Sequence, residues 1–171
     1  MVPLLFAKPP MGIDTRGGDT PKIASVEDQA NASLYKNKEG IVYAPSTWFE
    51  GALIKAGSSY KVEGRKTFKD ILKSSIFIDP IEIPLITTQE EPLVFSRVLG
   101  KKDGSRIEVA NARYNDWGFK FQITTTDQRL DAKYKEGQTN IEAILKFAGA
   151  NFGIGGWRPK FGRFEVTKFE I

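Results

Sequence analysis

The chain has 171 residues, of which 40% are hydrophobic, so it can bury a substantial core and is most simply interpreted as one domain, residues 1–171. Neither cysteine nor histidine occurs, which excludes disulfides, Cys/His zinc sites, thiol nucleophiles and histidine-based acid–base catalysis. The net charge of +4 is uneven: residues 1–96 carry 11 basic and 12 acidic side chains (−1), whereas residues 97–171 carry 14 and 9 (+5). The cationic surplus therefore lies in the C-terminal part.

The N-terminal residues predict a short buried strand followed by an insertion that covers residues 8–33. Val2–Ala7 is an apolar run, too short for a membrane span or a secretion signal, so we expect a cytoplasmic protein with no membrane association. Residues 8–24 hold three prolines and three glycines, which is typical of a long loop. Two interpretations of this loop stay open: a projection that grips a neighbouring subunit or a nucleic-acid strand, and a disordered insertion.

Helix starts are indicated by Ser or Thr followed three residues later by an acid. The pairs are Ser25 with Asp28, which begins a short helix through Leu34, Thr47 with Glu50, Thr67 with Asp70, and Thr139 with Glu142. Apolar residues at helical spacing then predict one buried face on the second and the last helix: Phe49, Ala52, Leu53 and Ala56, and Ile141, Ile144, Leu145 and Ala148. The last helix is expected to end at Gly149 or Gly153.

Strands are predicted before and after the central helices. Ile41–Tyr43 precedes the second helix, and Ile76–Leu85 is strand-like but interrupted by prolines, which favours a sheet edge or an extended connector. Leu93–Leu99 and Ile107–Tyr114 flank a glycine-containing turn and predict a hairpin. Trp117–Thr126 alternates apolar and polar residues, so we expect it to extend the hairpin into an antiparallel meander, with Trp117 in the core.

The C-terminal segment is the most informative part of the sequence. Residues 153–163 form a glycine-rich loop with three cations and two aromatics, and the loop leads into an expected last strand at residues 164–166. Glycine allows backbone amides to approach an anion closely, cations neutralise phosphate, and aromatic rings stack on bases. The alternative is a tight turn whose tryptophan covers the core.

The order of the predicted elements gives the fold class. Strand, inserted loop, helix, inserted edge segment, strands, helix and strand follow one another, which is a β-α-β-β-α-β plan. We therefore predict an α+β, ferredoxin-like antiparallel sheet of the RRM/RAMP kind, with helices on one face and inserted loops. In that plan the second face of the sheet is free to bind a ligand.

Two segments resemble hallmarks of the RAMP superfamily, the fold of CRISPR backbone and processing subunits. Residues 40–56 read as a strand, a turn with Pro45, and a helix in which Gly51 keeps the family's spacing and is followed by Ala52 and Leu53. The C-terminal loop is similar to the family's glycine-rich loop through Gly155, Gly156, Gly162 and Arg163.

Three positions depart from the family pattern, which usually has glycine at Ser46 and Lys160 and a basic residue at Ile54. The nearest likeness is to small standalone members from prophages and other mobile elements. The resemblance implies nucleic-acid binding.

The sequence therefore predicts a sequence-tolerant protein that binds and coats single-stranded DNA or RNA, as a homo-oligomer or filament. Two alternatives stay open: a guide-RNA-binding backbone subunit of a CRISPR-type complex, and a RAMP-type RNA-processing nuclease. The nuclease sites of RAMP relatives commonly rely on histidine, which is absent, so we expect no enzyme. RNA and DNA are not distinguished, because phosphate contacts and base stacking are common to both.

Cations, aromatics and glycines make up the candidate binding residues, and we expect no catalytic residue, metal site or cofactor. The candidates are Arg16, Lys22, Trp48, Lys55, Arg113, Tyr114, Lys120, Gly155, Gly156, Trp157, Arg158, Lys160, Phe161 and Arg163. Arg163 has a competing role, since at the start of the expected last strand it is also placed to pair with an acid such as Glu108.

Overall fold

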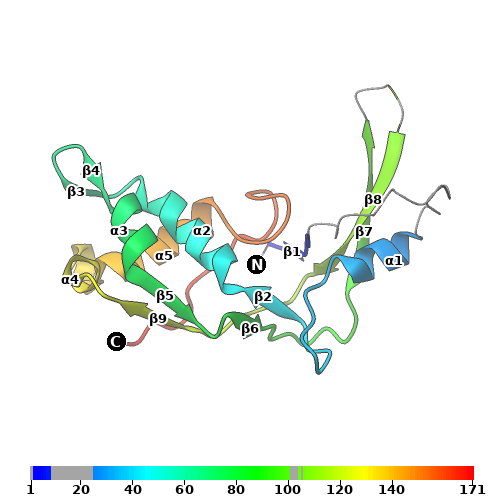
Figure 1. Ribbon diagram of the computed structural model, residues 1–171, viewed down its shortest axis with the longest axis horizontal. Coiled ribbons are helices and arrows are strands. Elements are labelled where there is room, and N and C mark those ends of the chain that lie inside the picture. Colours follow the sequence, from blue (N-terminus) through cyan, green and yellow to red (C-terminus); the bar gives the residue numbers. More distant parts are fainter. Residues whose placement is uncertain (1, 9–24, 101–103, 105) are drawn as a thin grey trace, which may run out of the picture.

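The computed structural model describes residues 2–8, 25–100, 104 and 106–171. Its helices are α1 (Val26–Ala32), α2 (Ser46–Gly57), α3 (Phe68–Ser75), α4 (Gln128–Asp131) and α5 (Asn140–Asn151), with a 3₁₀ turn η1 (Lys135–Gly137). Its strands are β1 (Leu4–Leu5), β2 (Tyr43–Pro45), β3 (Lys61–Glu63), β4 (Lys66–Thr67), β5 (Ile76–Asp79), β6 (Glu82–Pro84), β7 (Leu93–Gly100), β8 (Arg106–Tyr114) and β9 (Gln122–Thr125). Figure 1 shows the β7–β8 hairpin projecting from the end of the molecule opposite α3 and α4.

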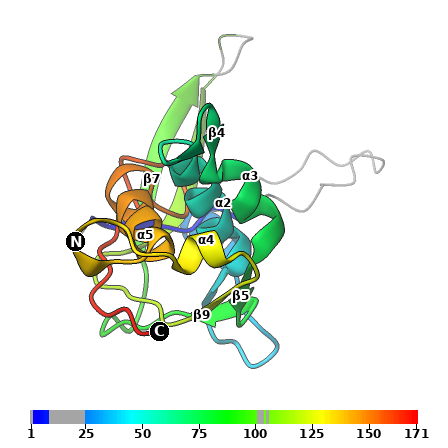
Figure 2. The ribbon, with the colours of Figure 1, turned by 90° about the vertical axis from the view of Figure 1, so that its left-hand side faces the viewer.

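The strands pair antiparallel, which together with the helices confirms the α+β class. Within the described residues they form four small sheets, with the orders β1–β8–β7, β2–β6, β3–β4 and β5–β9. Viewed from one end, β5 and β9 lie on one side of α2, α3 and α4 (Figure 2). The helices thus cover one side of the β5–β9 pair, and the other side faces outward.

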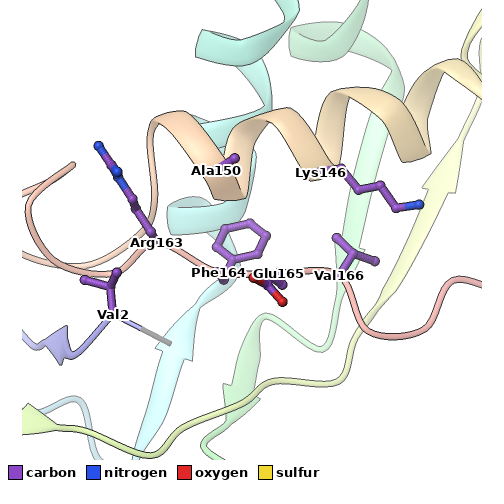
Figure 3. Close-up of a pocket in the computed structure, with 7 residues that line it drawn as sticks. All are labelled: Val2, Lys146, Ala150, Arg163, Phe164, Glu165 and Val166. Atoms are coloured by element: carbon purple, nitrogen blue, oxygen red, sulfur yellow. The ribbon is translucent and has the colours of Figure 1, made fainter.

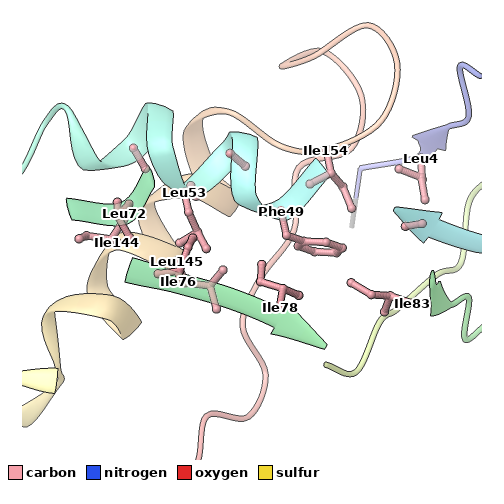
Figure 4. Close-up of a cluster of buried hydrophobic side chains, with 14 of the residues drawn as sticks. Leu4, Phe49, Leu53, Leu72, Ile76, Ile78, Ile83, Ile144, Leu145 and Ile154 are labelled. Carbon is pink, nitrogen blue, oxygen red and sulfur yellow. The ribbon is translucent and has the colours of Figure 1, made fainter. Parts of the chain in front are cut away.

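The core is a cluster of buried apolar side chains shared by the helices and the small sheets. Leu53 of α2, Leu72 of α3 and Ile144 of α5 meet the inward residues of β5, Ile76 and Ile78 (Figure 4). The predicted buried faces of α2 and α5 are confirmed in full.

Two of the predicted helix caps are confirmed by hydrogen bonds. The Ser25 hydroxyl accepts from the Asp28 amide at 3.0 Å, and the Thr139 hydroxyl accepts from the Glu142 amide at 3.3 Å. The hairpin is confirmed as well, since β7 and β8 pair from Leu93↔Arg113 to Gly100↔Arg106. These features depend on residues close in sequence, which is why they were predictable.

Of the other two predicted caps, Thr47 is wrong, whereas Thr67 is confirmed in position but not in its hydrogen bond. Helix α2 begins at Ser46 with Pro45 as its N-cap, so Thr47 lies inside the first turn, and the Ser46 hydroxyl donates to Glu50 Oε1 at 3.0 Å. Thr67 is the N-cap of α3, but its side chain makes no capping hydrogen bond. With proline directly before Ser46, α2 starts two residues earlier than the Thr47 pattern indicates.

The predicted meander is also wrong, because β9 pairs with β5 and not with β8. After β8 the chain turns inward: Trp117 is buried, and the rings of Phe119 and Phe121 lie 5.6 and 4.4 Å from the ring of Phe49 on α2. Packing against α2 carries the chain away from β8 before it resumes as a strand.

The expected last strand is not a strand in the described part of the chain. Residues 164–166 dock on α5, where the Phe164 amide donates to the Gly149 carbonyl at 3.2 Å. A Cβ at Gly149 would lie 2.3 Å from the Phe164 carbonyl oxygen, so this glycine serves a close approach inside α5, which continues to Asn151. The predicted projecting loop, residues 8–24, lies outside the described residues apart from Lys8.

Candidate nucleic-acid interface

The glycine-rich loop, residues 153–163, is fixed to the N-terminal strand by main-chain hydrogen bonds. The Gly156 amide donates to the Leu5 carbonyl at 2.7 Å, and the Gly162 amide donates to the Pro3 carbonyl at 2.9 Å. A third bond, from the Ile154 amide to the Gly162 carbonyl at 2.9 Å, closes the base of the loop. The amides of Gly156 and Gly162 therefore anchor the loop, which corrects the expectation that these two amides receive phosphate.

Close packing explains why glycine is needed in this loop. Gly162 has φ +74°, and a Cβ there would lie 1.8 Å from the Ile154 carbonyl oxygen. Gly155 has φ +75°, and its Cβ would lie 2.5 Å from the Leu5 carbonyl oxygen. Both positions combine a left-handed backbone with contacts that no side chain fits.

Trp157 stands at the outer end of the anchored loop and is stacked on an arginine of β7. The Arg97 guanidinium carbon lies 3.1 Å from the centroid of the Trp157 ring, and the Phe95 ring contacts Trp157 edge-on. Trp157 is still 42% exposed. Burial lowers the pKa of Arg97, and its Nε and Nη1 atoms are buried without a hydrogen-bond partner among the described residues.

Three cations are exposed on or beside this loop: Arg158, Lys160 and Arg163. Among the described residues no ion pair joins any of them to an acid, and Glu108 is itself exposed. The suggested pairing of Arg163 with a buried acid such as Glu108 is therefore wrong. The loop presents a concentrated positive charge next to an accessible indole.

Burial takes some of the predicted aromatics out of the candidate surface. Tyr114 is 3% exposed and packs against Phe6, and burial raises its pKa, with a smaller contribution from Glu91. Phe161 is 9% exposed and lies under Phe95, with 5.2 Å between the ring centroids. Neither ring is accessible to a base, because each fills a contact in the protein interior.

The remaining candidates are dispersed over other elements. Trp48 is half-buried between the rings of Phe6 and Tyr35, whereas Lys55 on α2 and Lys120 before β9 are exposed. Arg113 is half-buried on β8, and its Nε has no hydrogen-bond partner in the described structure. Arg16 and Lys22 lie outside the described residues.

The expected role of Trp117 is confirmed: it belongs to the core and donates from Nε1 to the Val2 carbonyl at 3.0 Å.

Arg97 is the residue that the sequence reasoning missed. The signal was present in the alternation of β7, which places Phe95, Arg97 and Leu99 on one face of the hairpin. A single cation on an otherwise apolar strand face needs a compensating contact, and Trp157 supplies it.

A shallow cavity of about 530 Å³ lies beside the loop, between α5 and the C-terminal segment. It is lined by Val2, Lys146, Ala150, Arg163, Phe164, Glu165 and Val166. Figure 3 shows Lys146 and Arg163 at opposite ends of the cavity with their side chains directed apart, and Lys146 is paired with Glu142 at 2.7 Å. The two cations therefore do not converge on one ligand group.

The side of the small sheets turned away from the helices has a different character. Tyr43 pairs with Pro84 and Pro45 with Glu82, and extending this register places Ile41 beside Ile86 on the same face. Phe77, 61% exposed, and Asp79 point outward from β5. We call this set of residues, with Ile81, the outer face; its charged side chains, Asp79 and Glu82, are acidic. Exposed Thr124 and Gln122 of β9 lie beside Phe77 and Asp79 on the same side and are neutral.

The pKa of Tyr43 is sensitive to the negative charge of the outer face. Its pKa is raised first by burial and then by the neighbouring Glu82 carboxylate. A carboxylate disfavours a second negative charge nearby, whether phenolate or phosphate. The outer face is therefore electrostatically less suited to a nucleic-acid backbone than the glycine-rich loop.

None of the described helices is long and apolar enough to cross a membrane. The described residues also contain no group of three or more acidic side chains placed to hold a metal ion. Comparison of the chain with protein-family models, with curated proteins and with solved structures finds no match.

Proposed function

We propose that this protein binds single-stranded nucleic acid, RNA or DNA, with little sequence preference, and that the glycine-rich loop is the contact surface. One observation carries the proposal: a loop anchored to β1 at its base exposes Arg158, Lys160 and Arg163 together with Trp157. Because hydrogen bonds to Pro3 and Leu5 hold the main chain of the loop, the backbone that carries these cations is positioned before a ligand arrives, which lowers the entropic cost of binding.

Each part of this surface has a recognisable use on a single strand. Exposed cations neutralise phosphates and release counterions, which gives affinity that depends on salt and not on base sequence. The accessible part of Trp157 offers a stacking surface for one base, since every base presents a π-face. Arg97 already covers one side of this indole, so stacking uses the opposite side or the exposed edge.

The finer fold assignment belongs to the same proposal: a ferredoxin-like protein of the RAMP kind that coats a strand as an oligomer. Two features support it. Strand β2 runs directly into α2 through Pro45 and Ser46, and the glycine-rich loop follows the last helix and lies against the first strand. A single small domain has a narrow footprint, so neighbouring subunits on one strand would supply affinity by multivalency.

The proposal is tested by titrating a fluorescent oligonucleotide, DNA and RNA in turn, with wild-type protein and a triple variant at several salt concentrations. Replacing Arg158, Lys160 and Arg163 by alanine should weaken binding of every sequence and flatten the salt dependence. The slope should fall by about one for each phosphate that the variant no longer neutralises.

The matched control removes the same charge elsewhere, by replacing Lys61, Arg65 and Lys66, all exposed around the β3–β4 hairpin. This variant should bind nearly as well as wild type and keep its salt slope. Equal reductions in affinity in both variants would mean that net charge alone attracts the strand. Undetectable binding of wild-type protein at low salt would overturn the proposal.

A further inference from the structure

Within the described residues, no strand pairs with the outer edge of the β7–β8 hairpin. In the sheet order β1–β8–β7, strand β7 is the outer strand and runs for eight residues. It contains neither proline nor lysine, the residues with which natural proteins commonly block an edge strand. Its one charge, Arg97, is held against Trp157.

The direction of the hydrogen bonds shows which groups of β7 face outward. On β8 the Ala110 amide donates to Gln29 Oε1 on α1, and the Ala112 amide donates to Ser33 Oγ directly after α1. The Ala112 carbonyl accepts from the Phe6 amide. The main-chain groups of these two residues therefore point away from β7. The main-chain groups of the odd-numbered residues of β8 therefore point towards β7, where they bond to residues 93, 95, 97 and 99. The main-chain groups of Val94, Ser96 and Val98 are left to face outward.

No main-chain hydrogen bond from elsewhere in the described residues reaches these three positions. The side chains around them are apolar and exposed: Leu93, Val94, Leu99 and, at 62%, Val98. Free main-chain groups flanked by apolar side chains are a template for another strand.

We infer that β7 pairs antiparallel with β7 of a second copy of this chain, about a two-fold axis at Ser96. In this register Ser96 faces Ser96 of the second copy, and Val94 faces Val98. These are the three outward-facing positions, and each pair exchanges two main-chain hydrogen bonds. On the other face of the strand, Leu93 meets Leu99 of the second copy.

The single charge disfavours one alternative register. Centred on Ser96, Arg97 lies opposite Phe95 of the second copy, a cation beside an aromatic ring. Moving the axis to Arg97 would place the two arginines directly opposite each other, which is unfavourable. The pairing is self-complementary in the way that a two-fold interface requires.

The contact is small. Residues 93–99 of each copy take part, fewer than the roughly 20–30 residues on each side of a standard interface, so we expect a dimer that dissociates on dilution. The inference does not depend on the proposed function. If both hold, the two-fold axis leaves both glycine-rich loops on the same face of the joined sheet, where one strand can cross them.

The absence of cysteine permits a direct test without nucleic acid. Ser96→Cys introduces the only thiol, and the paired Cα atoms, about 5.5 Å apart in a hydrogen-bonded pair, lie within disulfide range. Val98→Cys is the matched control, since it faces Val94 and has no thiol opposite. Under mild oxidation, non-reducing electrophoresis should show most of Ser96→Cys at twice 19.1 kDa and at least tenfold less cross-linking of Val98→Cys.

Light scattering of the unmodified protein should give a mass that rises with concentration towards twice 19.1 kDa. Ser96→Pro removes an outward-facing amide and leaves every hydrogen bond to β8 in place. Val98→Lys places a charge on the edge strand. Both variants should remain monomeric, with a circular dichroism spectrum like that of the wild type. Three results would each overturn the inference: equal cross-linking of both cysteine variants, a wild-type mass that stays monomeric at every concentration, or dimers that persist in Val98→Lys. If Ser96→Pro does not fold, Val98→Lys alone decides.

Discussion

The glycine-rich loop and the outer face differ in what holds them and in what they expose. The loop has its main chain tied to β1 and exposes cations around one indole. The outer face belongs to paired strands and exposes Phe77, isoleucines and carboxylates. A helix-free sheet surface is where an RRM-like plan would locate RNA, yet here the positive charge lies elsewhere. Fold-level analogy thus points to one surface and electrostatics to another.

The largest effect is expected from filling the tight base of the loop. Gly162→Ala forces a side chain onto the Ile154 carbonyl at a left-handed backbone position, and we expect a loss of roughly 3 kcal/mol or more in the free energy of unfolding. Gly51→Ala is the control, because a Cβ there meets nothing within 4 Å in the interior of α2. It should stabilise by up to about 1 kcal/mol. Chemical denaturation measures both, and equal stabilities would show that the loop is not anchored as described.

A smaller effect is expected from removing the exposed indole. Trp157→Ala should weaken strand binding about tenfold or more, since base–aromatic stacking contributes roughly 1–3 kcal/mol. Stability should fall by about 1 kcal/mol, because the variant lacks the ring on which Arg97 stacks. Fluorescence titration and thermal denaturation measure the two effects. Unchanged affinity in a folded variant would restrict the binding surface to the cations.

The corresponding change on the outer face should do little. Phe77→Ala removes the most prominent ring of that face, which is 61% exposed. Affinity for the oligonucleotide should stay within about twofold of wild type, and stability within about 0.5 kcal/mol. The same titration decides the matter: a tenfold loss of affinity here would move the binding site to the sheet.

The smallest effect is expected from removing one negative charge from the outer face. The Tyr43 pKa is raised above 10.0 by burial and by Glu82, so the neutral phenol stabilises the fold fully below pH 10. That contribution is lost as the pH rises through the raised value. Glu82→Gln should lower the Tyr43 pKa towards 10.0, which ultraviolet titration of tyrosine follows, and should make the loss of stability above pH 10 smaller. An unchanged pKa would mean that Glu82 does not act on this face.

Local patterns in the sequence predicted the features that local contacts determine. The Ser25 and Thr139 caps, the buried stripe of α2 and the β7–β8 hairpin each depend on residues close in the chain. The partner of β9 was not predictable in this way, because Phe119 and Phe121 turn the chain towards Phe49 on α2. Periodicity identifies the buried side of a strand and not the strand beside it.

The candidate surface was predicted in part for the same reason. Exposed Arg158 and Lys160 follow from a polar, glycine-rich loop. The burial of Tyr114 and Phe161 and the stacking of Arg97 on Trp157 depend on contacts between distant segments, which composition and spacing do not contain. Glycine in the loop suggests an anion cradle from composition alone, whereas close packing explains two of these glycines: Gly155 packs against β1, and Gly162 packs against Ile154 within the loop.

The most direct test of the central claim identifies the residue that touches the strand. An oligonucleotide carrying a photoreactive halogenated pyrimidine, irradiated in complex with the wild-type protein, cross-links to an aromatic side chain that stacks on the base, and mass spectrometry of the digested product identifies it. We predict that the cross-linked peptide contains Trp157. A cross-link at Phe77 or Tyr43 would place the strand on the outer face and contradict the account.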